Sequence, residues 1–206
     1  MVSAGAGDLV AAQTVWLVNY NVALRSHCCE RVGHERVVKT LQLVQGTADD
    51  IAFVMAAERL PGYDELVGRW SEAQHRAALA DGRHTYFIAR LESQDIGFAI
   101  VRDWASPERT ACIKRLAVSS PGRGHGRMLL AGLVDLIFGD TDAHRIWLGV
   151  FPENDRARRA YEAVGFKAEG LARGSAFFGG VYRDELVMAL LRPEWSAGRD
   201  VNDAKF

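Results

Sequence analysis

The chain has 206 residues, which is long enough for one α/β domain with a buried core and short for two. Hydrophobic residues make up 49% and charged residues 25%, a globular balance that excludes a disordered or fibrous protein. Lys plus Arg number 25 and Asp plus Glu 26, so the formal net charge is -1 and no overall basic field exists to hold a nucleic-acid backbone.

Cysteine usage and hydropathy indicate a cytoplasmic protein. The three cysteines, Cys28, Cys29 and Cys112, have neither the even number of a disulfide framework nor the spacing of a metal site. No apolar run reaches the ~18 residues of a membrane span, and no basic segment precedes the first apolar stretch as in a secretory signal. We therefore expect no metal, no membrane partner and no nucleic-acid partner.

The first forty residues differ in pattern from the rest of the chain. Their apolar residues keep no clean period, and the segment CCERVGHERVVKT is charged. We expect residues 1–40 to form an N-terminal extension outside the core fold, residues 41–193 to form one domain, and residues 194–206 to form a C-terminal tail. A start that is not native to the protein is the alternative for the first segment.

From residue 41 onward, regular elements are predicted in quick succession. LQLVQ alternates as a short strand. Thr47 and Asp50 come close to a capping box at the start of a first helix, which Pro61-Gly62 ends. Ser71 and Gln74 form a capping box at the start of a second helix. TYFIARL and DIGFAIV then predict two strands of a hairpin.

The second half alternates strands with helices. TACIKRLAV is a strand, and the following segment RMLLAGLVDLIFGD has helical spacing, with one apolar face made of Leu130, Leu133, Val134 and Ile137. RIWLGVF predicts a strand, DRARRAYEAV a helix, and FKAEGLARGSAFF with VYRDELVMALL a long closing hairpin. The order β-α-α-β-β-β-α-β-α-β-β predicts an α/β (α+β) fold with a mixed central sheet flanked by helices.

A glycine-rich loop joins the strand TACIKRLAV to the helix after it. Gly122, Gly124 and Gly126 lack Cβ atoms, so the backbone can turn sharply and approach a ligand. Free N–H groups and the dipole at the helix start favour a pyrophosphate, and Arg123 and Arg127 add positive charge. The spacing is neither that of the dinucleotide fold nor that of the nucleotide P-loop. Taken alone, the loop could also be a glycine turn without a ligand.

A second motif begins about thirty residues later. Asn154, Ala157 and Tyr161 are spaced i, i+3 and i+7, so an amide and a phenol share one helix face with a small residue between them. Asn154 suits the N-cap, and Gly165 ends the helix. Each residue taken alone could be only a cap or only core packing. Both together, after a glycine cradle, favour a functional site.

Over residues 41–192, about three quarters of the chain, the sequence resembles the GCN5-related N-acetyltransferase (GNAT) superfamily. The family loop, Arg/Gln-x-x-Gly-x-Gly/Ala, is matched at Gly124 and Gly126, with Pro121 in place of the Arg or Gln. The second family motif, Asn-x-x-Ala-x-x-x-Tyr-x-x-x-Gly-Phe, is matched at every fixed position over residues 154–166. The resemblance implies a GNAT acetyltransferase domain over residues 41–193.

The resemblance also implies roles for individual residues. Tyr161 would be the catalytic acid that protonates the leaving thiolate, and its ordinary pKa near 10 keeps a phenol protonated at pH 7. Asn154 would contact the pantetheine of acetyl-CoA. The strand main chain would bind pantetheine and polarise the thioester carbonyl, at Leu116, Ala117 and Val118. The loop would bind the pyrophosphate, at Gly122, Arg123, Gly124, His125, Gly126 and Arg127.

The general base is not assigned by these motifs. Relatives often carry a carboxylate five residues ahead of the motif asparagine, and here that position is Gly149. An amine with a pKa near 10.4 must lose a proton before it reacts at pH 7. Five candidates stay open, although residues of these types are more often solvated surface residues: Glu72, His75, Asp103, Asp184 and Glu185.

We expect an acetyl-CoA-dependent N-acetyltransferase that acts on a primary amine of a small molecule. One alternative is a protein N-terminal acetyltransferase of the ribosomal-protein type. Another is a non-catalytic acyl-CoA-binding module, which the absent strand carboxylate favours and the intact Asn154 and Tyr161 oppose. Tyr63 and Trp70 could line the acceptor slot or pack in the core. Whether the chain forms a homodimer is left open.

Overall fold

The computed structural model describes residues 15–16 and 40–203, with the backbone alone for 15–16 and 198–203. Eight described strands form one sheet in the order β1-β2-β3-β4-β5-β6-β8-β7, and every neighbouring pair is antiparallel except β5 and β6. The strands are β1 (Val15–Trp16), β2 (Leu41–Gln45), β3 (His84–Leu91), β4 (Gln94–Arg102), β5 (Thr110–Val118), β6 (Arg145–Val150), β7 (Lys167–Phe178) and β8 (Val181–Leu191).

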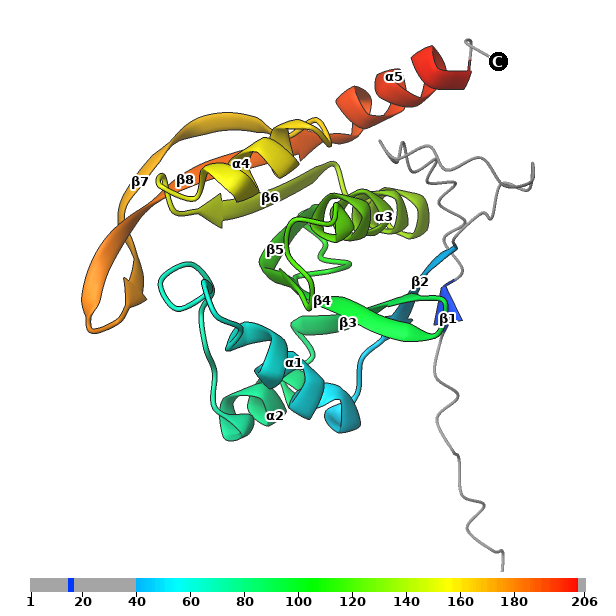
Figure 1. Cartoon of the computed structure of the whole chain (residues 1–206). Coiled ribbons are helices and arrows are strands. Elements are labelled where there is room, and N and C mark those ends of the chain that lie inside the picture. The colour runs from blue at the N-terminus through cyan, green and yellow to red at the C-terminus, as the bar shows by residue number, and fades with distance from the viewer. Residues whose placement is uncertain (1–14, 17–39, 204–206) are drawn as a thin grey trace, which may run out of the picture.

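Helices cover both faces of this sheet (Figure 1). They are η1 (Ala48–Asp50), α1 (Ile51–Glu58), α2 (Glu72–Ala80), α3 (His125–Asp140), α4 (Asp155–Glu162) and α5 (Arg192–Asp203). From β2 to β8, the predicted order of strands and helices is confirmed. The differences lie at the two ends, where β1 pairs with β2 and α5 continues from β8.

Local sequence signals explain where the first helices begin. Both capping boxes form: Asp50 accepts from the backbone N–H of Thr47, and Gln74 accepts from that of Ser71 while the Ser71 hydroxyl accepts from Gln74 N. Helix α1 ends at Glu58, before Pro61, which cannot continue a helix.

Two cores form, one on each face of the sheet. The side chains of α1 and α2 pack against β3, β4 and β5 around Tyr86, Ile88 and Phe98. On the other face, α3 buries its apolar stripe: Leu130, Leu133, Val134 and Ile137 are all at most 1% exposed. Burial of each such side chain stabilises the fold by about 1.5–3 kcal/mol, so the two layers hold the central strands in a fixed register.

Strands β5 and β6 diverge along their length, and this divergence positions the candidate site. They pair only from Thr110 to Cys112 on β5 and from Arg145 to Trp147 on β6. On its other edge, β5 follows β4 up to Val118, with a bulge where Ile100 faces Arg115 and Val101 faces Ile113. The remaining halves of β5 and β6 therefore face one another without pairing.

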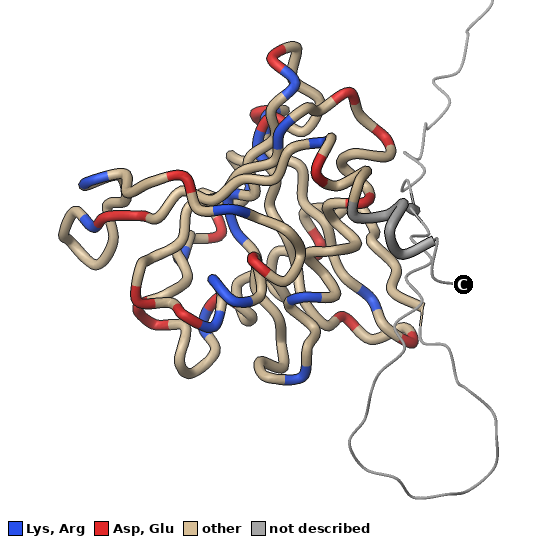
Figure 2. Tube along the Cα trace, turned by 90° about the horizontal axis from the view of Figure 1, so that it is seen from above, with Lys and Arg blue, Asp and Glu red and all other residues tan. Residues whose placement is uncertain are grey.

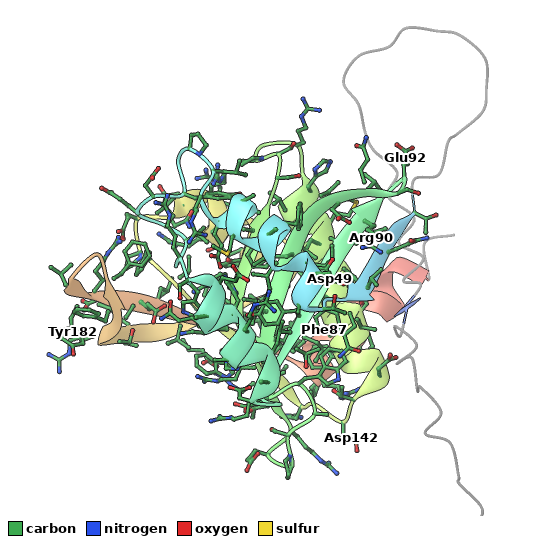
Figure 3. The ribbon with its side chains drawn as sticks, turned by 90° about the horizontal axis from the view of Figure 1, so that it is seen from below. Asp49, Phe87, Arg90, Glu92, Asp142 and Tyr182 are labelled. Carbon is green, nitrogen blue, oxygen red and sulfur yellow. The ribbon has the colours of Figure 1, made fainter. Side chains whose placement is uncertain are left out.

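The β7–β8 hairpin projects beyond the rest of the sheet (Figure 1), and Tyr182 lies near its tip, directed away from the body (Figure 3). Lys and Arg positions are interspersed with Asp and Glu positions along the trace (Figure 2). No helix of the described residues is long and apolar enough to cross a membrane.

The domain boundaries lie partly beyond the described residues. Most of the expected extension 1–40 is outside them, together with Cys28 and Cys29; its described part is the two-residue strand β1, which pairs with Val44 and Leu43. The expected tail 194–206 overlaps α5. There, the Trp195 indole packs against the Phe138 ring at a centroid distance of 5.3 Å, so this segment contacts α3.

Candidate functional site

A cleft of about 740 Å³ opens where β5 and β6 separate. Its walls come from the loop between α1 and α2, the unpaired half of β5, the glycine loop, the end of β6, α4 and the β7–β8 hairpin. The strand main chain of Leu116, Ala117 and Val118 lies along one wall. Because these residues pair with β4 on one edge and with no described strand on the other, the second edge can receive an extended ligand.

The glycine loop forms the mouth of the cleft at the start of α3. Gly122 (φ +84°) and Gly124 (φ +80°) adopt left-handed backbone conformations that strain other residues, and Gly124 is the N-cap of the helix. A Cβ added at Gly126 would meet nothing within 4 Å, so space for a ligand lies directly over the first turn. This geometry suits an anion, because free N–H groups of a helix start point into it.

Most of the predicted binding residues meet in this one cleft, but two do not. The main chain of 116–118, Asn154, Arg127 and the three loop glycines all line it, together with Tyr161. Arg123 and His125 are not among the lining residues. The neighbouring residues Gly124 and Gly126 line the cleft instead.

Helix α4 presents Asn154 and Tyr161 to the cleft. The Asn154 Oδ1 accepts from Ala157 N at 3.1 Å, so the side chain caps the helix and its amide nitrogen keeps donor capacity. Burial raises the pKa of Tyr161 to about 12, with a smaller contribution from the nearby Tyr63. The phenol therefore keeps its proton throughout the neutral range.

Tyr63 and Trp70 line the cleft and also pack in the core between α1, α2 and the sheet. The Tyr63 hydroxyl donates to the Val118 carbonyl at 3.2 Å, which ties the loop after α1 to the end of β5. The Trp70 ring lies under the Arg115 guanidinium, 4.4 Å from its centroid. Arg115 itself was not predicted, because strand periodicity alone gives no signal for a charge on this wall.

A buried polar network supports Arg115 from behind the cleft. Glu58 and His75 are both fully buried; Arg115 Nη1 donates to Glu58 Oε1 at 2.5 Å, and His75 Nε2 lies 3.3 Å from Glu58 Oε2. Burial alone would raise the pKa of Glu58, but the hydrogen bond from His75 and the charge of Arg115 hold it below the ordinary value. Because a carboxylate only accepts, His75 donates through Nε2, and its Nδ1 lies 2.9 Å from the Tyr86 hydroxyl.

The structure separates the five candidate bases. His75 belongs to the buried network, while Glu72 pairs with Arg76 and Asp103 with Arg83 outside the cleft. Asp184 accepts from Gly174 N at 2.8 Å and does not line the cleft either. Glu185 is the one candidate among its lining residues.

Within residues 40–197, no group of three or more His, Cys, Asp or Glu side chains could hold a metal ion. Cys112 is a free, buried thiol on β5, and burial raises its pKa to about 11. It therefore stays a thiol at neutral pH and has the character of a core residue.

A mixed sheet with one diverging strand pair, a glycine loop at a helix start and an asparagine–tyrosine helix define an acetyltransferase-type fold. The family model described as "Acetyltransferase (GNAT) family" matches residues 53–166, more than half of the chain. The chain belongs to this family.

Named relatives act on different kinds of acceptor. The ribosomal protein uS5-alanine N-acetyltransferase of Escherichia coli is 27% identical over 52% of this chain and 57% of that protein. The aminoglycoside N(6')-acetyltransferase type 1 of Klebsiella pneumoniae is 28% identical over 51% of this chain and 64% of that protein. The chain spans less than two thirds of the length of these curated relatives.

Among solved structures, the spermidine N-acetyltransferase of Vibrio cholerae in complex with CoA and spermine superposes with a TM-score of 0.64. The match covers 76% of this chain and 98% of that chain at 22% sequence identity. This likeness shows that the two proteins share a fold.

Proposed function

We propose that this protein is an acetyl-CoA-dependent N-acetyltransferase that acts on a primary amine of a small molecule. The observation that carries the proposal is the convergence of three elements on one cleft: the glycine loop, the unpaired edge of β5 and the face of α4 that bears Asn154 and Tyr161. Family membership supports acetyl-CoA as the acyl donor.

The shape of the cleft suits a long, thin donor molecule. The first turn of α3 would receive the pyrophosphate on its free N–H groups, with Arg127 beside it. The pantetheine arm would then run along β5 like an added strand and form hydrogen bonds with the main-chain N–H and C=O groups of residues 116–118. Asn154 would reach the same arm with its amide nitrogen.

The acetyl group would transfer directly to the amine. The amine nitrogen attacks the thioester carbonyl carbon, and a main-chain N–H of β5 stabilises the negative charge that develops on its oxygen. As the tetrahedral intermediate collapses, the C–S bond breaks and the Tyr161 phenol gives its proton to the leaving thiolate. The pKa of about 12 keeps that proton in place before the step.

The kind of acceptor distinguishes this proposal from a protein N-terminal acetyltransferase. The aminoglycoside enzyme and the spermine-bound structure are named for small amines, which supports a small-molecule acceptor. The relative named for ribosomal protein uS5 supports a peptide N-terminus at a similar level of identity. We favour the small amine, because two of the three relatives have such acceptors.

A panel assay tests both acceptor and activity. The intact protein is mixed with acetyl-CoA and either aminoglycosides, polyamines and simple alkylamines, or peptides with free N-termini, and thiol release is followed. Turnover with small amines is expected to exceed turnover with peptides. Faster reaction with the peptides would establish the N-terminal acetyltransferase instead. Acetyl-CoA binding without thiol release from any acceptor would leave a binding module.

A further inference from the structure

The structure brings the Glu185 carboxylate into the space beside Gly149, on a wall of the cleft. A Cβ built on Gly149 would lie 2.7 Å from Glu185 Oε1 and 2.9 Å from its Cδ. The Glu185 side chain, which extends from β8, therefore fills the space that a side chain on β6 would occupy. Both residues line the cleft, together with Tyr161.

A bulge in β7 holds this carboxylate from the other side. Residues 173–175 are left out of the β7–β8 register, which moves from Ala172 to Ala176. The bulge brings the Ser175 hydroxyl to Glu185, and it donates to Oε2 at 2.8 Å. Asp184, the neighbour of Glu185 on β8, accepts from the backbone N–H of Gly174 in the bulge, so the two adjacent acids have different partners. Asp184 holds the bulge, and Glu185 faces the cleft.

Glu185 differs from the second carboxylate that lines the cleft. Asp64 pairs with Arg69 at 2.6 Å, its side chain is 64% exposed, and that arginine lowers its pKa. Glu185 has Ser175 as its hydrogen-bond partner and forms no ion pair within the described residues. Its Oε1 is therefore available to accept from a bound cation.

We propose that Glu185 is the general base of the acetyl transfer. This assignment rests on the proposed function. An acceptor ammonium would donate to Glu185 Oε1, the proton would pass to the carboxylate, and the freed nitrogen lone pair would form the N–C bond. The C–S bond would break and the thiolate would leave with the proton of Tyr161. The attacking nitrogen, which still carries one proton too many, would lose that proton through water to restore the Tyr161 phenol. Glu185 would return its own proton to water, so that charge and atoms balance over one turnover.

The charges around Glu185 fit this role. Lys114 and Arg115 on β5 line the same cleft, and Arg115 is already neutralised by Glu58. From α4 the cleft receives the Tyr161 phenol and the Arg156 side chain, and on β5 Glu185 is one of the groups that raise the pKa of the buried Cys112 thiol.

The pH profile of a Glu185→Gln variant separates proton transfer from a structural role. Only about one lysine-like amine in 10³ is neutral at pH 7, so an enzyme without a base depends on that fraction. We expect kcat/KM of the variant to fall roughly 10²–10⁴-fold at pH 7. We expect the defect to shrink about tenfold per pH unit toward pH 9, as the neutral amine becomes abundant. A purely structural role would lower activity by one factor at every pH.

Moving the carboxylate provides a second test. Glu185→Ala opens the space beside Gly149, and adding Gly149→Asp returns a carboxylate to it from β6. The double variant should recover at least tenfold in kcat/KM over Glu185→Ala at pH 7. Glu72→Gln, which removes an exposed carboxylate outside the cleft, serves as control and should keep wild-type activity.

All variants are assayed as the full chain with the best amine of the panel, and acetyl-CoA binding is measured by calorimetry. Two outcomes would overturn the assignment of Glu185 and leave the proposed function standing. In the first, Glu185→Gln has the same kcat/KM as an active wild type. In the second, kcat/KM of the variant is lower by the same factor at every pH. No turnover by the wild type with any acceptor would overturn the proposed function and this assignment with it.

Discussion

At the scale of single residues, the protonation state of a side chain in this cleft is set by what surrounds it. Tyr161 sits on α4 against the core and beside Tyr63, and burial raises its pKa to about 12. A phenol in water would already be protonated at pH 7, so burial makes the acid insensitive to pH over the whole neutral range. In the proposed mechanism, this proton is then available at the moment the thiolate leaves.

Tyr161→Phe removes one hydroxyl and keeps the ring. We expect kcat to fall roughly 10²–10⁴-fold, the usual contribution of a general acid. The amine KM should change little, because the lost interaction is made mainly in the transition state. Tyr182→Phe, at a residue 76% exposed, is the matched control and should leave turnover unchanged. If kcat holds and only the KM for acetyl-CoA rises, Tyr161 binds the donor in the ground state and transfers no proton.

Gly126→Val tests the anion cradle without backbone strain. Unlike Gly124, Gly126 has no left-handed φ, and a side chain there meets nothing within 4 Å, so the protein should fold normally. The valine would instead occupy the space over the first turn of α3, and acetyl-CoA affinity measured by calorimetry should fall at least tenfold. Gly139→Val, at an exposed glycine near the other end of α3, adds the same side chain and should bind acetyl-CoA as the wild type does. Equal affinity for both variants would contradict the cradle.

Some residues of the candidate site can be identified from the sequence, and others only from the structure. Gly124, Asn154 and Tyr161 could be found because their spacing along one loop or one helix face carries the signal. Glu185 could be named only as one of five candidate bases, and Arg115 could not be named at all, because their roles depend on what other elements place beside them. The absence of a side chain at Gly149 has meaning only once β8 is known to lie next to β6.

At the scale of elements, sequence patterns predict what each segment is better than they predict what it contacts. The stripe on α3 and the capping boxes of the first helices are local signals, and the elements from β2 to β8 follow them. Strand β1 has two residues, too few for any periodicity. Helix α5 carries Pro193 and Gly198, and it overlaps the predicted tail 194–206. Arg192, at the start of this helix, donates to the carbonyls of Phe138, Thr141 and Ala143. Those contacts are long-range and leave no local pattern.

The buried network joins α1, α2, β3 and β5, and its stability should depend on pH. The Glu58 pKa in the folded protein lies below the ordinary value, so its contribution is complete above the unfolded pKa of about 4.3 and is lost as pH falls through the folded value. Glu58→Gln leaves Arg115 buried, at 8% exposure, without its counter-charge. We expect it to cost about 3–5 kcal/mol at pH 7 in urea unfolding.

The difference in stability between wild type and Glu58→Gln should narrow as the pH falls below about 4.3, because the carboxyl of the unfolded chain takes up a proton there while that of the folded protein does so only at lower pH. Glu72→Gln removes an exposed partner of Arg76 on α2 and should cost under about 1 kcal/mol at either pH. A Glu58→Gln penalty that stays constant down to pH 3 would show that packing, and not charge, holds this network.

At the scale of the whole molecule, the cleft exists because two halves of one sheet separate. The β4 and β5 half is held between α1 with α2 on one face and α3 on the other, while β6 and β8 extend toward the projecting hairpin (Figure 1). Strand order in the sequence does not reveal where two parallel neighbours stop pairing. The location of the candidate site could therefore be predicted from motifs, but the separation of β5 and β6 that opens the cleft could not.

The same architecture predicts that the fold does not need residues before Thr40. Leu41 and Leu43 of β2 are fully buried against α3 and the sheet, whereas β1 adds two paired residues at the outer edge. Loss of one or two backbone hydrogen bonds costs about 1 kcal/mol each. A chain that begins at Thr40 should lose under about 8 °C in Tm and keep its acetyl-CoA affinity.

A chain that begins at Gly46 provides the contrast, because it also removes β2. Exposing the edge of β3 and emptying the space of two buried leucines should cost at least about 4 kcal/mol, on the scale of total domain stability. We expect this shorter chain to lose its cooperative thermal transition, measured by circular dichroism, while the chain from Thr40 keeps it. If both chains lose the transition, the segment before Thr40 belongs to the core, and the boundary inferred here between extension and domain is wrong.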